Sequence, residues 1–314
     1  MAGQPGPLFT APVEPGGYRW WYLDGLSDDA RFGVTVIALL GSVFSPYYAW
    51  AGRRDPLDHI SMNVCLYDRE GSLGRWSMTE RRRSALQRHG DQLTIARSSL
   101  AWRDGAFHLQ VDERCAPWPS PLRGQIRLTP ETINERVFAL DAAGRHHWQP
   151  IAPTARLEVD FTQPELSWRG QGYMDSNVGT EPLEAGFQRW DWSRSAQDGE
   201  ALVLYDAMAR DGARRSLALR FDAEGGVEER AAPPPAALPS TRYWGIARGT
   251  QADRPDAARL LATFENTPFY ARSLIESEID GTRAVSFHES LDLDRFSRGW
   301  VRFLLPFRMP RRFL

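Results

Sequence analysis

Two short patterns in the sequence combine residues that can move protons with aromatic rings. They are His146-x-Trp148 and Tyr173-x-Asp175, each a pair separated by one residue. In an extended strand, the side chains of residues i and i+2 point to the same side of the sheet. We therefore expect His146 and Trp148 to share one face, and Tyr173 and Asp175 to share one face.

Asp175 is the strongest candidate for acid–base chemistry. Trp168 and Tyr173 are close to it in the sequence, so an inward-facing carboxyl group would lie in poorly hydrated surroundings, where desolvation raises its pKa. A carboxylic acid that stays protonated is a general acid, and an alkene is a weakly basic group that it could protonate. Aromatic faces could stabilise the resulting cation. The alternative role for this Asp is to cap a turn at Ser176 and Asn177.

Further aromatic residues are clustered or follow the same two-residue spacing. They stand in the run from Arg19 to Asp24, in Trp190-x-Trp192 and beside Asp206. Core packing is the commoner role of such rings. We nevertheless predict that five of them contact a substrate: Trp21, Tyr22, Trp190, Trp192 and Tyr205.

The sequence lacks the common cofactor and metal motifs. It has no glycine-rich phosphate loop, no GxSxG, no HExxH and no paired CxxC, which disfavours nucleotide, serine-hydrolase and zinc chemistry. A metal at His146 and His147 would need a third ligand that the sequence does not locate, so a surface, core or proton-relay role is the better interpretation. Cys65 and Cys115 form no close pair. We expect no cofactor and no metal.

Composition and charge narrow the choice of partner and compartment. The chain has 38 basic and 40 acidic residues, a net charge of −2, so no overall field attracts it to nucleic acid. The longest apolar stretch, Val34–Phe44, is interrupted and shorter than the ~20 residues of a membrane-spanning helix. The first residues do not resemble a signal peptide. These features predict a cytoplasmic protein.

The distribution of turn-forming and aromatic residues predicts strands. Twelve Trp, 22 Pro and 26 Gly are scattered between short apolar runs, a pattern typical of short strands joined by turns. We predict an all-β, mainly antiparallel fold of barrels or sandwiches. Helices are expected only at Thr79–His89 and Leu293–Arg298. Arg230–Ser240 contains three consecutive prolines and is expected to be a stiff, extended connector.

Four segments are predicted along the chain. They are a flexible lead-in (1–17), an N-terminal domain (18–183), a C-terminal domain (184–298) and a tail (299–314). The tail mixes four arginines with apolar residues, a composition that suits a membrane interface. A final strand with a frayed end is the alternative, because Pro306 and Pro310 would interrupt an amphipathic helix.

Three segments near the N-terminus resemble the carotenoid 1,2-hydratases, also called hydroxyneurosporene synthases. They are Gly41–Pro56, Asp58–Tyr67 and Trp76–Arg81. The likeness continues through the two short patterns and through the segments around Trp190 and Tyr205, and it covers the chain from about Tyr18 to Arg295.

The resemblance implies a fold, an activity and a set of site residues. The family has paired lipocalin-like domains and serves a pigment pathway of photosynthetic bacteria. Without a cofactor, it adds water to the terminal C1=C2 double bond of acyclic carotenoids such as neurosporene and lycopene. Its functional residues correspond to His146, Trp148, Tyr173 and Asp175.

A mechanism is expected from these roles. Asp175 would protonate C2, and water would capture the tertiary cation at C1. Trp148 and Tyr173 would stabilise the cation, while His146 would orient Asp175 or accept the proton released by water. Because His147 follows His146 directly, a one-residue slip would exchange the two imidazoles. A protein that meets so apolar a substrate is expected at the inner membrane, peripherally bound. The alternatives are a non-catalytic carotenoid or lipid carrier and an isoprenoid cyclase.

Overall fold

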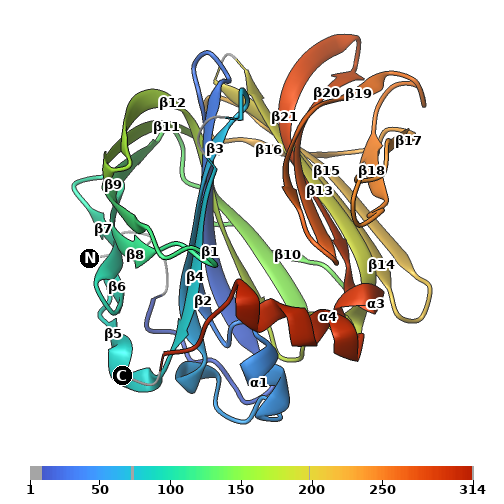
Figure 1. Cartoon of the computed structure of the whole chain (residues 1–314). Coiled ribbons are helices and arrows are strands. Elements are labelled where there is room, and N and C mark those ends of the chain that lie inside the picture. The colour runs from blue at the N-terminus through green and yellow to red at the C-terminus, as the bar shows by residue number, and fades with distance from the viewer. Residues whose placement is uncertain (1–8, 72–73, 198, 313–314) are drawn as a thin grey trace, which may run out of the picture. The chain divides into compact units, whose positions relative to one another are not determined.

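The computed structural model describes residues 9–71, 74–197 and 199–312. Antiparallel strands dominate, and the helices are few and short (Figure 1). The chain forms two compact units. Unit 1 comprises Met1–Pro182 and Phe303–Leu314, and unit 2 comprises Leu183–Arg302. The all-β class predicted from the sequence is confirmed, while the predicted domain limits remain predictions.

Unit 1 is built on one long antiparallel sheet. Its strands lie in the order β4-β3-β2-β1-β12-β11-β9-β8-β7-β6-β5, and β10 pairs with β11. The strands are β1 (Tyr18–Ser27), β2 (Phe32–Leu40), β3 (Ile60–Asp68), β4 (Arg75–Arg81), β5 (Leu86–Arg88), β6 (Gln92–Ile95), β7 (Ser98–Arg103), β8 (Ala106–Arg114), β9 (Pro121–Pro130), β10 (Phe138–Ala139), β11 (His146–Gln163) and β12 (Glu165–Gly179). Single helical turns are α1 (Pro46–Trp50), η1 (Pro56–Asp58) and η2 (Arg83–Ala85).

The sheet of unit 1 curls around one apolar core. Residues of β1 to β3 and of β6 to β9 belong to the same buried cluster, and β3 lies against β6 and β4 against β8. Trp21 and Leu23 of β1 and Met174 of β12 point into this cluster. Since side chains alternate along a strand, the chain neighbours of these three residues face the other side of the sheet. The candidate site lies on that side.

Unit 2 contains a second antiparallel sheet and a separate hairpin. The sheet has the order β16-β15-β14-β13-β21-β20-β19, and β17 pairs with β18. The strands are β13 (Phe187–Gln197), β14 (Glu200–Ala209), β15 (Arg214–Phe221), β16 (Val227–Arg230), β17 (Pro235–Leu238), β18 (Arg248–Gln251), β19 (Ala258–Asn266), β20 (Tyr270–Ile279) and β21 (Thr282–Asp292). The helical turns are α2 (Leu183–Gly186), α3 (Leu293–Phe296) and α4 (Gly299–Leu304), whose last two residues belong to unit 1. A further turn, η3 (Leu305–Phe307), belongs to unit 1.

The C-terminal segment, drawn in red in Figure 1, returns to unit 1 and pairs with β4. The Glu80 amide donates to the Pro310 carbonyl, and the Arg312 amide donates to the Glu80 carbonyl, each over 3.0 Å. The Arg311 guanidinium binds the Glu80 carboxylate and donates to Asp58 Oδ2 over 3.0 Å. The last described residues are therefore held by backbone and ionic contacts to unit 1.

The helix expected at Thr79–His89 is wrong. Thr79 lies in β4, opposite Met62 of β3, and the chain then makes the turn η2 and the short strand β5. Thr79 to Arg81 pair with β3, and Leu86 to Arg88 pair with β6. This tertiary context overrides the local helical preference. The second expected helix is confirmed at α3, where Asp292 Oδ1 accepts from the Arg295 amide over 2.9 Å. The expected connector Arg230–Ser240 includes β17, which pairs with β18.

Candidate functional site

Asp175 is the centre of the candidate site in unit 1. The Trp148 indole donates from Nε1 to Asp175 Oδ2 over 2.8 Å, and the Tyr173 hydroxyl donates to the same oxygen over 2.9 Å. All three side chains are buried. Buried polar groups need hydrogen-bond partners, and here donors from two strands converge on one carboxyl oxygen.

The pairing of β11 with β12 positions these donors. Trp148 lies opposite Asn177, and the register shifts between Gln149 and Ala152, where β11 is irregular. The Trp148 backbone is paired with Asn177, but its indole hydrogen-bonds Asp175, two residues earlier on β12. On the other side of β12, Tyr22 of β1 lies opposite Asp175, and its ring meets that of Tyr173 edge-on at 6.3 Å.

Tyr173 donates as a neutral phenol. Burial raises its pKa well above the ordinary value of 10.0, and the negative charges of Asp175 and Asp24 raise it further. The hydroxyl therefore keeps its proton at neutral pH and remains a donor whatever the protonation state of Asp175.

Two more polar side chains face this side of the sheet. Asn177 follows Asp175 by two residues on β12, and Thr35 of β2 lies opposite Asp24. Asn177 Nδ2 and Thr35 Oγ1 are buried, and neither atom has a hydrogen-bond partner among the described residues. Such atoms can hydrogen-bond a water. The i+2 spacing from Asp175 could have identified Asn177, but Thr35 becomes visible only once the strands are paired.

His146 lies on the same face of the sheet as Trp148 and Asp175, but it belongs to a different cluster of polar side chains. The Tyr18 hydroxyl donates to its Nδ1 over 2.9 Å, and its Nε2 donates to Glu181 Oε1 over 3.3 Å. Burial lowers the pKa of His146, although Asp141 and Glu181 act in the opposite direction. A neutral imidazole with the proton on Nε2 satisfies both hydrogen bonds.

The register separates His146 from Asp175. His146 lies opposite Gly179, four residues beyond Asp175 on β12, which corresponds to about 13 Å at about 3.3 Å per residue. His147 is half-buried and lies on the opposite face, because side chains alternate along β11. His146 is therefore the imidazole that shares a face with Trp148.

Trp21 lies on the other side of the sheet from Asp175. It belongs to the apolar core of unit 1, where its ring packs at 5.0 Å from that of Phe9. The prediction that Trp21 contacts substrate therefore remains a prediction, and its observed contacts are those of the core. Tyr22, the next residue, faces Asp175 because successive side chains point to opposite faces.

The other three aromatic residues that we predict to contact a substrate are in unit 2. Trp190 and Trp192 of β13 are buried, as is Tyr205 of β14. The rings of Trp190 and Tyr205 meet edge-on at 5.6 Å, and Trp192 lies opposite Tyr205 in the strand pairing. These three rings form one aromatic cluster within unit 2.

A buried polar cluster fastens the β17–β18 hairpin to the sheet of unit 2. The Gly249 amide donates to Asp191 Oδ1 over 3.1 Å, and His288 Nε2 donates to the Gly249 carbonyl over 2.8 Å. Ser290 donates to the same Asp191 oxygen. Burial raises the pKa of Asp191 to about 6 and lowers that of His288 to about 4. Burial thus shifts both groups towards their uncharged forms, and their contacts hold the hairpin.

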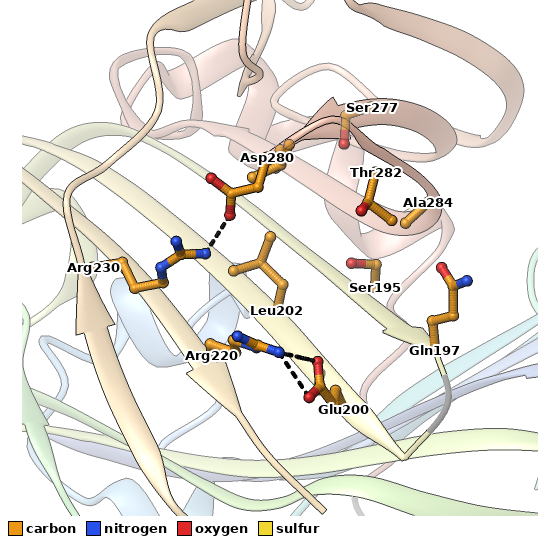
Figure 2. A pocket seen from close by; sticks show the side chains of 12 residues that line it. Ser195, Gln197, Glu200, Leu202, Arg220, Arg230, Ser277, Asp280, Thr282 and Ala284 are labelled. Atoms are coloured by element: carbon orange, nitrogen blue, oxygen red, sulfur yellow. Dashed lines mark hydrogen bonds and ion pairs between the residues drawn. The ribbon is translucent and has the colours of Figure 1, made fainter.

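Unit 2 also contains a cavity of about 490 Å³ at the end of its sheet. Figure 2 shows two ion pairs in its lining: Arg220 donates to Glu200 over 2.7 Å, and Arg230 binds Asp280. Leu202 and Ala284 add apolar surface. Because each arginine is paired with a carboxylate of the same wall, this lining presents little net charge to a ligand.

Metal and membrane features are absent from the described part of the chain. In residues 9–71, 74–197 and 199–312, no three His, Cys, Asp or Glu side chains are grouped in a way that could hold a metal ion. None of the helices in these ranges is long and apolar enough to cross a bilayer.

Comparison with known families and curated proteins gives consistent matches. The family described as carotenoid hydratase CrtC matches residues 36–314. The acyclic carotenoid 1,2-hydratase of Thiocapsa roseopersicina is 54% identical over 309 residues, covering 98% of this chain and 76% of the relative. The protein of the same name from Rubrivivax gelatinosus is 43% identical, with 98% and 76% covered.

Solved structures share the fold at low sequence identity. An AttH-type protein of Nitrosomonas europaea aligns with a TM-score of 0.61 and 13% identity, covering 88% of this chain and 92% of that chain. Kievitone hydratase of Nectria haematococca aligns with a TM-score of 0.55 and 8% identity, covering 90% and 92%. These likenesses support a lipocalin-like arrangement of strands.

Replacing His146 should destabilise the protein far more than replacing His147. His146→Ala leaves the buried Tyr18 hydroxyl without its acceptor and costs about 2 to 3 kcal/mol in the free energy of unfolding, because unsatisfied buried polar groups are costly. His147→Ala should cost under about 0.5 kcal/mol, as is usual away from buried networks. Urea denaturation measures both. Equal losses would contradict the assignment of His146 to the buried cluster.

Asp191 and His288 should influence stability in opposite directions between pH 6.5 and 4. Since the pKa of His288 falls from 6.5 to about 4 on folding, its contribution is lost as the pH falls through this range, by about 3 kcal/mol at about 1.4 kcal/mol per pKa unit. The pKa of Asp191 rises on folding from 3.8 to about 6, so protonation of Asp191 stabilises the fold as the pH falls.

Variants that remove either group should therefore differ from the wild type in stability, and the two differences should change with pH in opposite directions. Relative to the wild type, His288→Gln should gain stability as the pH falls from 6.5 to 4, and Asp191→Asn should lose it. Urea denaturation of all three proteins at several pH values gives the comparison. Parallel pH profiles would show that neither group changes its pKa on folding.

Proposed function

The chain belongs to the carotenoid hydratase family and is a hydro-lyase, and we propose that it adds water to the terminal C1=C2 double bond of an acyclic carotenoid with Asp175 as the proton donor. Its relatives named acyclic carotenoid 1,2-hydratase support the reaction. The observation that carries the proposed mechanism is the convergence of Trp148 and Tyr173 on one oxygen of a buried carboxyl group.

The two donors favour proton transfer from Asp175 to C2. Both bonds end on Oδ2, so the acidic proton is carried on Oδ1. When the proton leaves, Asp175 becomes an anion, and hydrogen bonds to an ionised acceptor are roughly twice as strong as those to a neutral one. The bonds from Trp148 and Tyr173 are thus stronger in the transition state than in the resting state, which is the requirement for catalysis.

The second step is capture of the tertiary cation at C1 by water. Aromatic faces attract cations, and Tyr22, Tyr173 and Trp148 surround Asp175. Proton addition and water capture transfer no electrons to or from the substrate, so the reaction balances as alkene plus water gives alcohol. For this reason we propose a cofactor-independent reaction.

His146 is assigned a positioning role. Its distance from Asp175 along β12 does not favour direct orientation of that carboxyl group. Its bonds to Tyr18 and Glu181 join the starts of β1 and β11 to the residues after β12. His146 thereby maintains the register that brings Trp148 to Asp175. Trp190, Trp192 and Tyr205 remain proposed substrate contacts in unit 2.

An exposed apolar stripe supports peripheral contact with the inner membrane from the cytoplasmic side. It is formed by Phe303, Leu304 and Phe307 of unit 1, whose exposed fractions are 68%, 36% and 66%. Their spacing of i, i+1 and i+4 places them on one side of a helical segment, and Leu305 is buried. The exposed Arg312 follows the segment, an arrangement that suits anionic lipid.

The hydration proposal is tested with lycopene in detergent and oxygen-18 water. The wild type should give an alcohol that carries one labelled oxygen, with no cofactor added. Asp175→Asn should reduce this activity at least about a hundredfold, the usual contribution of a general acid, while it retains the circular dichroism spectrum and pigment binding. Asp160→Asn, an exposed substitution on β11, is the matched control.

Other products would identify the alternatives. Unchanged but tightly bound pigment would favour a carrier, and an isomer of unchanged mass would favour a cyclase. Near-normal hydration by Asp175→Asn would remove Asp175 as the proton donor.

Removing the apolar stripe should weaken membrane binding. The Phe303→Ser/Phe307→Ser double variant should bind vesicles of anionic phospholipid at least about tenfold less tightly, because each buried aromatic ring contributes more than about 1 kcal/mol. Trp118→Ser, which removes an 83% exposed ring of unit 1 outside the stripe, should bind like the wild type. Sedimentation with vesicles measures the difference, and equal binding by all three proteins would rule out this surface.

A further inference from the structure

A second carboxyl group, Asp24, lies on the same face of the sheet as Asp175. Asp24 of β1 is opposite Tyr173 of β12 in the strand pairing, and its exposed fraction is 0%. Its chain neighbour Leu23 points into the apolar core, so Asp24 points the other way. Fully buried aspartates are rare, and this one lies beside the phenol that donates to Asp175.

Strand geometry places Asp24 next to both Tyr173 and Thr35. Residues directly opposite in an antiparallel pair have Cβ atoms about 4.5 to 5.5 Å apart. Asp24 has such a neighbour on each side, Tyr173 on β12 and Thr35 on β2. The Thr35 hydroxyl is buried and has no hydrogen-bond partner among the described residues. It can therefore hold a water beside Asp24.

Both carboxyl groups act on a single phenol, that of Tyr173. Tyr173 donates to Asp175 Oδ2, and the charge of Asp24 acts on the same phenol. Two buried carboxylates so near each other repel, which favours a state in which they hold one proton between them. One group is then an acid and the other a base, as hydration of an alkene requires.

We propose that Asp24 is the base that accepts the proton released by the attacking water and returns it to Asp175 through the Tyr173 hydroxyl. The inference rests on the proposed function, because it assigns the second half of the same reaction. Asp24 is then a catalytic residue, since it contacts the reacting water, and Thr35 is a positioning residue for that water.

The steps balance in protons and charge. Asp175 gives its proton to C2, which leaves a carboxylate and a cation at C1. The oxygen of water bonds to C1, and one of its protons passes to the Asp24 carboxylate. Asp24 then protonates the Tyr173 oxygen as the Tyr173 hydroxyl proton moves to Asp175. The site returns to its starting state, and the product is the neutral tertiary alcohol.

The experiment compares water with an anionic nucleophile that needs no base. Asp24→Ala and Asp24→Asn are incubated with lycopene in detergent, with and without sodium azide, and the products are analysed by mass spectrometry. Both variants should lose hydration at least about a hundredfold, as expected on removal of a general base. In Asp24→Ala, azide can occupy the vacated space and capture the cation, giving at least one tertiary azide per protein molecule.

Parallel variants separate the two halves of the reaction. Asp175→Ala should form neither alcohol nor azide, because no cation arises. Asp160→Ala, on the exposed side of β11, should hydrate like the wild type. Circular dichroism checks the fold of every variant, and Asp24→Asn, similar in size to the wild-type residue, is used if Asp24→Ala does not fold.

Three outcomes are decisive. Hydration by Asp24→Asn within about threefold of the wild type would overturn the inference. So would the loss of hydration by a folded Asp24→Ala without formation of azide product. If instead the wild type forms no labelled alcohol, or Asp175→Asn still hydrates, the proposed function itself fails, and this result is distinct from failure of the Asp24 assignment.

Discussion

Two hydrogen bonds that meet on one carboxyl oxygen of Asp175 are the contacts on which the proposed mechanism depends. Trp148 and Tyr173 reach it from different strands, over 2.8 and 2.9 Å. The geometry requires the register of β11 on β12 and the irregularity after Gln149. A slip of one residue would send a side chain to the other face of the sheet. The hydrogen bonds at Asp175 therefore depend on the observed register of β11 on β12.

The long sheet of unit 1 provides this register by having two chemically different buried faces. One face carries Leu23 and Met174 into the apolar core, whose burial stabilises the fold. The other carries Asp24 and Asp175, polar groups whose burial opposes folding unless they are hydrogen-bonded. Stability provided by the core face allows the polar face to retain buried acidic groups, to which we assign the proposed chemistry.

Local patterns in the sequence predicted part of this arrangement. The two-residue spacing of Tyr173 and Asp175 is sufficient to place both side chains on one face, and the frequent turns predict an all-β chain. Periodicity cannot show which strands pair, so the opposition of Asp24 and Tyr173 was not predictable. The same limit explains the mistaken helix at Thr79–His89, whose first residues pair with β3 and whose last residues form β5 and pair with β6. The run of aromatic residues around Trp21 likewise gives no indication of which side of the strand is the core, so its packing in the core cluster was not predictable.

The proposed mechanism requires Asp175 to be protonated in the resting protein, and infrared difference spectroscopy can observe this proton. The spectrum of the wild type minus that of Asp175→Asn, recorded near neutral pH in water and in deuterium oxide, reports the state of this one carboxyl group. If Asp175 is the proton donor, the wild type should show a carbonyl band of a protonated carboxyl group that shifts in deuterium oxide and is absent from the variant. A pair of carboxylate bands in its place would show that Asp175 is ionised at rest and would contradict its role as the proton donor.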